Sequence, residues 1–180
     1  MLFHIRNIKA IRSLLPRKAT EQLMHSLVSS RLDYCNALLY NLPAYQLQKL
    51  QRIQNIAARV VTLTPTRMHI TPVLKALHWL PVSKRIVFKV LLLTYKCVKG
   101  LAPEYLCDLV KPYVKTFNSR SNSKCLIEVP RTYLKTYGDR SFSFAAATEW
   151  NSIPLEIRQA ETVEVFKQNV KTYLFKIYFR

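Results

Sequence analysis

Apolar residues recur every three or four positions through long stretches of this sequence, and proline or glycine stands between the stretches. The clearest example is the segment 44–62, where the apolar positions are Leu47, Leu50, Ile53, Ala57 and Val60. This period is that of one face of an α-helix. The chain has two glycines, which disfavours a tightly turned all-β fold and glycine-rich phosphate loops. The sequence therefore predicts a mainly α fold, a bundle-like assembly of helices.

One part of the chain departs from the helical period. Cys125–Val129 alternates between apolar and polar residues, Pro130 ends it, and Tyr133–Tyr137 follows as a candidate partner. Alternation of this kind is typical of a β-strand with one buried face. We therefore expect one short β-hairpin near residues 125–137, preceded by a polar connector over residues 114–124 that is rich in Ser and Asn.

The charge of the chain is strongly positive. It contains 28 Lys and Arg residues against 10 Asp and Glu residues, a net charge of +18. A folded protein with this surplus repels itself unless an anion offsets the charge, and nucleic acid is the commonest such partner. Two other interpretations stay open: a basic surface that serves only solubility, and a fragment whose acidic partner domain is missing.

The residues needed for catalysis or metal binding are not grouped in the sequence. Asp33, Asp108 and Asp139 lie in unrelated segments, whereas two-metal polymerases and nucleases need several converging carboxylates. The cysteines lack zinc-site spacing, and no histidine lies in a recognised nucleophile pattern. We therefore predict no catalytic residue, metal site or cofactor in this chain, and no enzyme activity from it alone. Its uncharged apolar runs are too short to span a membrane, so no membrane partner is expected.

Three groups of residues are candidate nucleic-acid contacts. Two follow helix faces with a spacing that suits a phosphate backbone: Lys49, Arg52 and Arg59, and then Arg85, Lys89, Lys96 and Lys99. The third mixes cations with tyrosines: Arg131, Tyr133, Lys135 and Arg140, with Tyr137 among them. This mixture suits single strands, because aromatic rings stack on bases while cations hold phosphates. The alternative is that the basic residues are solvated helix faces and the tyrosines belong to a core.

Several motifs, in a fixed order, carry a family resemblance. They are RLDYCNALL, HWLPV, GLAPEYL and YGDRSF, within longer stretches such as LQKLQRIQNIAARVVT. Together they resemble the C-terminal region of reverse transcriptases from non-LTR retrotransposons of the LINE type, in the jockey and chicken-repeat lineages. The resemblance runs from about residue 3 to residue 178. The departures include Ala147 and Glu149, where relatives usually carry Pro and Leu before the Trp-Asn pair.

The resemblance implies a function and a domain order. In such proteins this region follows the polymerase palm, so residues 1–40 resemble thumb helices and residues 41–113 a helical C-terminal core. Residues 125–180 then supply the short hairpin and the last helices, after the connector at 114–124. The region is expected to hold template RNA, an RNA–DNA hybrid or target DNA. The Mg²⁺-binding aspartates of the parent RNA-directed DNA polymerase belong to the palm and have no matching positions here.

The implied partners are RNA or DNA and the missing palm domain, in the nucleus or in a cytoplasmic ribonucleoprotein. Two alternatives remain. The chain is either an inert, truncated relic of a transposable element, or a mitochondrial protein whose first twenty residues act as a presequence, since they carry five basic residues and no acid before Glu21.

Overall fold

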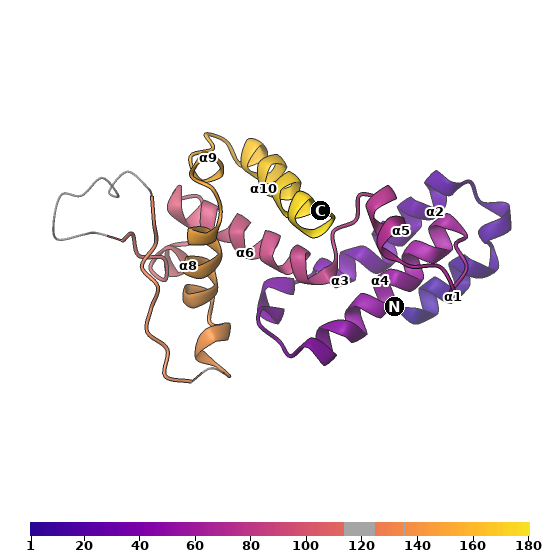
Figure 1. Cartoon of the computed structure of the whole chain (residues 1–180), viewed down its shortest axis with the longest axis horizontal. Helices are drawn as coiled ribbons and strands as arrows, with labels where there is room; N and C mark the ends of the chain where they lie inside the picture. The colour runs from indigo at the N-terminus through magenta and orange to yellow at the C-terminus, as the bar shows by residue number, and fades with distance from the viewer. Residues whose placement is uncertain (114–124, 135) are drawn as a thin grey trace. The chain divides into compact units, whose positions relative to one another are not determined.

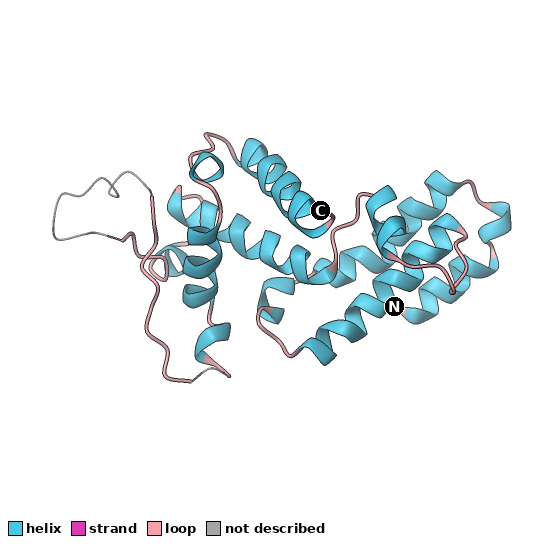
Figure 2. Cartoon of the chain, viewed as in Figure 1, coloured by secondary structure: helices cyan, strands magenta, loops and turns pink. Residues whose placement is uncertain are grey.

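The structure is a computed structural model that describes residues 1–113, 125–134 and 136–180. Helices make up most of it, and the described residues contain no β-strand (Figures 1 and 2). The predicted mainly α class is therefore confirmed. The chain divides into two compact units. The first unit comprises Met1–Asn36, Leu42–Arg85 and Ile177–Arg180, and the second comprises Ala37–Asn41 and Ile86–Lys176.

The first unit is built from short helices packed on one long helix. Its helical elements are α1 (Leu2–Ala10), η1 (Arg12–Leu14), α2 (Arg17–Met24), the π-helical turn η2 (His25–Ser29), α3 (Ser30–Asp33), α4 (Ala44–Thr62), α5 (Thr71–Ala76) and the first turn of α6 (Val82–Val98). Helix α4 coincides with segment 44–62, for which the apolar period predicted a helix. Its buried face, which includes Ala57, Ala58 and Val61, packs with Ile5, Met24, Val28 and Leu74 in one core.

The guanidinium group of Arg12 completes the C-terminal end of α4. It donates to the carbonyl oxygens of Val60 at 3.0 Å and Val61 at 2.9 Å, and also to that of Leu15 at 2.7 Å. The last carbonyl groups of a helix have no partner within the helix, and a cation there also interacts favourably with the helix dipole. The Arg12 side chain therefore stabilises the C-terminal end of α4.

Two glutamines of α4 fix the entry into α6. The buried Gln54 side chain donates to the carbonyl oxygen of Leu80 at 2.8 Å, and the Gln51 side chain accepts from the backbone N–H of Val82 at 2.9 Å. The Gln51 side chain also donates to the Gln54 side chain at 3.0 Å, so the two glutamines form one hydrogen-bonded pair. These bonds satisfy backbone groups that would otherwise be buried without partners.

The second unit has an aromatic core. Its helical elements are η3 (Asn36–Leu39) after Asn36, most of α6, α7 (Glu104–Cys107), η5 (Gly138–Arg140), α8 (Phe142–Ser152), α9 (Leu155–Arg158) and α10 (Val163–Tyr178) up to Lys176. The buried rings of Tyr95 and Phe166 stack with centroids 4.2 Å apart, and Trp150 lies 5.9 Å from Phe166. The Tyr95 hydroxyl donates to the carbonyl oxygen of Ala160 at 2.9 Å, so the polar end of this core residue is also satisfied.

The predicted hairpin near residues 125–137 is wrong. Ile127 forms an isolated antiparallel bridge with Pro112, flanked by backbone hydrogen bonds from Tyr113 to Leu126 at 3.0 Å and from Glu128 to Lys111 at 2.9 Å. The other side of Ile127 is taken by the Asn151 side chain, which accepts from its N–H at 3.0 Å and donates to its carbonyl oxygen at 2.8 Å. Because the Asn151 amide replaces a neighbouring strand, Ile127 needs no partner from residues 133–137. The predicted connector 114–124 lies outside the described residues.

The compact units also differ from the domain boundaries drawn from the sequence. The first 36 residues share a core with α4 and α5, whereas the sequence-based division separated 1–40 from 41–113. The change between the units falls within α6, between Arg85 and Ile86. A continuous helix gives no sequence signal of such a change, because the apolar period runs through it without a break.

Candidate nucleic-acid interface

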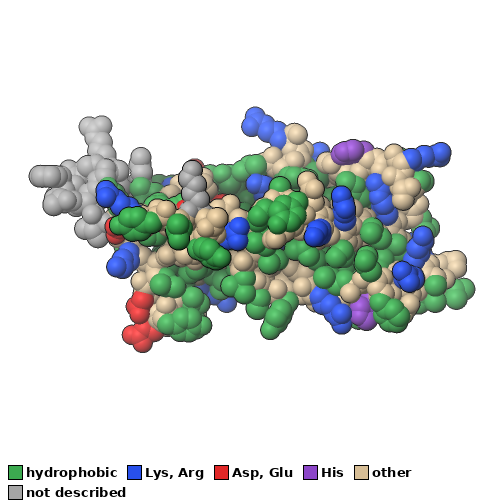
Figure 3. All heavy atoms as spheres, turned by 90° about the horizontal axis from the view of Figure 1, so that it is seen from below, with side chains coloured by type: hydrophobic (Ala, Val, Ile, Leu, Met, Phe, Trp, Pro, Cys, Tyr) green, Lys and Arg blue, Asp and Glu red, His purple; other side chains and the backbone are tan. Residues whose placement is uncertain are grey.

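Positive charge is concentrated on the first unit. That unit contains 14 Lys and Arg residues against 2 acidic residues, a net charge of +12, whereas the second contains 14 against 8, a net charge of +6. Figure 3 shows one face of the molecule, on which Lys and Arg side chains are spread widely and Asp and Glu side chains are few. The first unit is therefore the stronger candidate for binding a polyanion.

The first unit has two acidic side chains, and each lies near a basic residue of the same unit. Asp33 accepts two hydrogen bonds from the Arg85 guanidinium, one from Nε at 2.8 Å and one from Nη2. A Glu21 carboxylate oxygen lies 3.7 Å from Nε2 of His25, one helical turn away. The net charge of +12 already includes both acids, so the unit keeps a positive potential.

The three predicted residues on α4 differ in their contacts: Lys49 and Arg52 are exposed, whereas Arg59 is bound to backbone carbonyl groups. Lys49 and Arg52 are exposed, and the Lys49 ammonium lies 5.9 Å from the centre of the Tyr45 ring. Arg59 instead donates to the carbonyl oxygens of Pro65 and Met68, the latter at 2.6 Å, and so holds the turn that follows α4. A guanidinium bonded to neutral carbonyls keeps its charge, but its position is fixed by the turn.

The four predicted residues on α6 belong to two different compact units. Arg85 belongs to the first unit and is bound to Asp33. Lys89, Lys96 and Lys99 belong to the second unit, where Lys89 and Lys96 are partly buried and Lys99 is exposed, with its ammonium 5.7 Å from the centre of the Tyr95 ring. The four residues therefore do not act as one uninterrupted run of free cations.

The third predicted group lies in the second unit. Arg131 and Tyr133 are exposed, and Arg140 is partly exposed and donates from Nε to the carbonyl oxygen of Asn41 at 3.2 Å. Lys135 lies outside the described residues. Arg158, by contrast, is buried, and burial lowers the pKa of its guanidinium, so it is not a surface contact.

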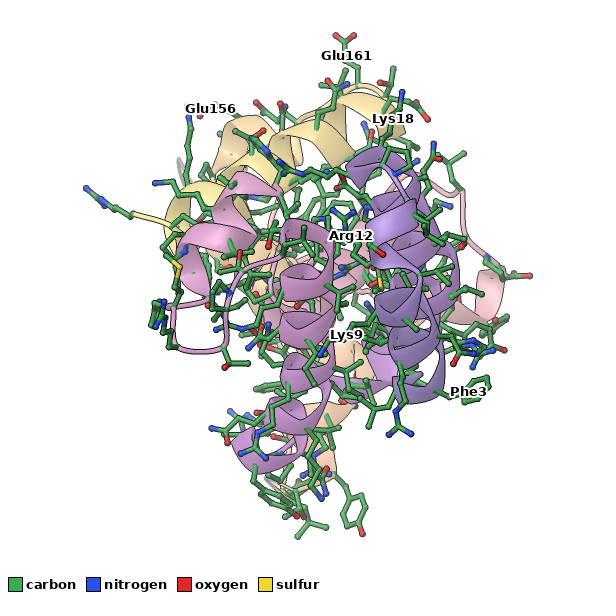
Figure 4. All side chains as sticks on the ribbon, turned by 90° about the vertical axis from the view of Figure 1, so that its right-hand side faces the viewer. Phe3, Lys9, Arg12, Lys18, Glu156 and Glu161 are labelled. Carbon is green, nitrogen blue, oxygen red and sulfur yellow. The ribbon has the colours of Figure 1, made fainter. Side chains whose placement is uncertain are left out.

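Several exposed cations of the first unit were not among the predicted contacts. Four of them lie near the N-terminus: Arg6 and Lys9 on α1, and Arg17 and Lys18 on the first turn of α2. In the view of Figure 4, Arg12 lies between Lys9 and Lys18. The absence of acids from the first twenty residues is the sequence feature that indicates this group.

Two further findings concern metal binding and membrane insertion in the part of the chain that the structure describes. The described residues contain no group of three or more His, Cys, Asp or Glu side chains arranged to hold a metal ion. No described helix combines the length and the hydropathy that a bilayer crossing requires. Comparisons of the chain with protein-family models, with curated proteins and with solved structures found no match.

Proposed function

We propose that this chain is a nucleic-acid-binding, non-catalytic region of a LINE-type retrotransposon reverse transcriptase, which holds template RNA or an RNA–DNA hybrid by its backbone. The single observation that carries the binding role is the first unit's net charge of +12, from 14 basic and 2 acidic side chains. A surface of this kind attracts any polyanion and releases condensed counterions when it binds a nucleic acid.

Exposed cations on three helices of the first unit would make the phosphate contacts. Lys9 on α1, Lys18 on α2, and Lys49 and Arg52 on α4 are all exposed and basic. Contacts of this kind fix position and give affinity without reading bases. Binding is therefore expected to depend steeply on salt and weakly on sequence.

The ancestry part of the proposal rests on the ordered motifs RLDYCNALL, HWLPV, GLAPEYL and YGDRSF. The aspartates that hold Mg²⁺ in such polymerases belong to the palm, which this sequence does not contain, so the chain alone would not incorporate nucleotides. The palm is the second proposed partner. In support, the first unit exposes large apolar side chains at Phe3 and Leu14, with 67% and 81% of their surface accessible.

Fluorescence anisotropy with a labelled single-stranded RNA and a labelled RNA–DNA hybrid tests the binding role. The reversals Lys9→Glu, Lys49→Glu and Arg52→Glu, combined in one variant, should weaken both complexes by at least roughly tenfold at low salt. The matched control combines Lys111→Glu, Lys171→Glu and Lys176→Glu, which reverses three exposed lysines of the second unit and should have a smaller effect. Equal affinities for the first variant and the unchanged chain would contradict the assignment to the first unit.

The ancestry has its own test. The genomic reading frame upstream of this sequence should encode, in frame, a palm with an adjacent Asp-Asp pair. A frame that encodes an unrelated domain there would contradict the parentage and leave the binding measurements as they stand.

A further inference from the structure

A short loop of the second unit is closed at its base by side-chain and backbone contacts. The Thr132 hydroxyl donates to the Asp139 carboxylate at 2.6 Å, so residues 132 and 139 are held together. The backbone N–H of Gly138 donates to the carbonyl oxygen of Leu134 at 2.7 Å, which makes a tight turn inside the loop. A Cβ atom at Gly138 would lie 2.6 Å from the Cβ of Thr132, so this close approach requires glycine.

The base of the loop is anchored to the rest of the second unit. Arg140, which directly follows the closing residue Asp139, donates to the carbonyl oxygen of Asn41 at 3.2 Å. The next residue, Ser141, begins α8 as its N-cap and accepts from the N–H of Phe144 at 3.4 Å. The loop therefore has a defined conformation at its base and is joined to a helix of the core.

The loop presents aromatic rings to solvent. Tyr133 is 99% exposed and Tyr137 is 77% exposed, and Leu134 between them is also exposed. A tyrosine in a core buries its ring, and the expectation that these two tyrosines belong to a core does not hold for this loop. The high exposure of Tyr133 and Tyr137 leaves their rings accessible to a ligand.

We propose that the described residues of this loop, 131–134 and 136–140, form a stacking site for the unpaired bases of single-stranded RNA or DNA, an inference that rests on the proposed function. Tyr133 and Tyr137 would stack on bases, while the charges of Arg131 and Arg140, on either side of the loop, would hold the adjoining phosphates. The one acid among these residues, Asp139, accepts the Thr132 hydrogen bond, which fixes its carboxylate at the base of the loop.

The chemistry favours single strands over duplex. Every base has a π face that a tyrosine ring can cover, so stacking is tolerant of sequence, but in a duplex both faces of each base are already stacked on neighbours. The second unit also has the smaller net charge, +6, so phosphate attraction alone is weaker there and stacking has to supply more of the affinity.

The test uses the full chain with a fluorescein-labelled oligouridine and a labelled blunt-ended RNA duplex, measured by anisotropy. The variant Tyr133→Ser, Tyr137→Ser should lose at least roughly tenfold in affinity for oligouridine, because each stacked base contributes a factor of about five or more. Its affinity for the duplex should change less than twofold. Tyr133→Phe, Tyr137→Phe keeps both rings and should bind oligouridine as the unchanged chain does.

Tyr105→Ser is the matched control, because Tyr105 is an exposed tyrosine of the same unit that lies on α7 and outside the loop. Far-ultraviolet circular dichroism checks that each variant is folded. Unchanged oligouridine affinity in the serine variant, or an equal loss in the phenylalanine variant, overturns the loop assignment alone. An unchanged chain that binds only the duplex does the same, whereas one that binds neither nucleic acid overturns the proposed function together with the loop.

Discussion

The hydroxyl group of Tyr40 donates a hydrogen bond of 2.8 Å to the carboxylate of Glu149, 109 positions later in the sequence. Both residues belong to the second unit. The bond therefore joins two segments that are distant in the sequence. It also gives the Glu149 carboxylate a hydrogen-bond donor at a partly buried position.

Alkaline pH should weaken the folded state through Tyr40. Burial, and then the hydrogen bond and the charge of Glu149, raise the pKa of Tyr40 far above its ordinary value of 10.0. The unfolded chain loses this proton first as the pH rises past about 10, so the stabilisation is full below that pH and declines above it. The free energy of unfolding, measured in urea at about pH 8 and about pH 11, should fall less in Tyr40→Phe than in the unchanged chain.

Tyr133→Phe is the control for that measurement, because the same hydroxyl is removed from a ring that is almost fully exposed. It should leave the alkaline decline unchanged. A decline in Tyr40→Phe as large as in the unchanged chain would show that Tyr40 does not contribute to it.

Removal of the charge of Asp33 should lower the stability of the fold without weakening RNA binding. The Asp33 carboxylate holds Arg85 through two hydrogen bonds, and 18% of the Arg85 side chain is exposed. Asp33→Asn should therefore lower the free energy of unfolding by about 1 kcal/mol. Because it frees a cation, it should not weaken RNA binding, and anisotropy checks this point. Asp108→Asn, at an exposed aspartate, is the control for stability, and weaker RNA binding by Asp33→Asn would contradict the electrostatic account.

Asn151 should be essential to the fold of the second unit. Its side chain satisfies both the N–H and the carbonyl oxygen of Ile127, a residue that is buried. Asn151→Ala leaves both groups without this partner and should cost about 2–4 kcal/mol in urea unfolding. Amide hydrogen exchange at Ile127 should also become faster. Asn169→Ala, at an exposed position of α10, should cost far less, and equal costs for the two would refute the role of Asn151.

Salt dependence should distinguish the free cations of α4 from the structural one. Neutralising Lys49 and Arg52 to Gln should reduce the slope of log affinity against log salt by roughly 0.7 for each phosphate of a single strand that the protein then leaves unneutralised. Arg59→Gln should instead lower stability, because Arg59 holds the carbonyl groups of Pro65 and Met68. Titrations at several salt concentrations measure the slopes. The assignment fails if the Arg59 variant alters the slope and the Lys49, Arg52 variant does not.

Features that depend on near neighbours could be predicted from the sequence. The helical class followed from the apolar period, because a helix bonds residues four positions apart and repeats its buried face at that interval. The period of segment 44–62 became α4, and Gly100 ends α6 with a φ of +66°, a conformation that suits glycine. The hairpin failed because the partners of Ile127 are Pro112 and Asn151, and neither is near it in the sequence.

The amino-acid sequence alone predicts that the protein is helical, that it carries a large excess of positive charge and that its three aspartates lie in unrelated segments. Which cations remain available to a ligand depends on the tertiary packing. Arg12 is bound to the end of α4, Arg59 to the turn after it and Arg85 to Asp33, and none of these uses follows from composition or spacing. Charge is a property of each residue, whereas the partner of a guanidinium group is set by the packing that brings distant carbonyl and carboxylate groups to it.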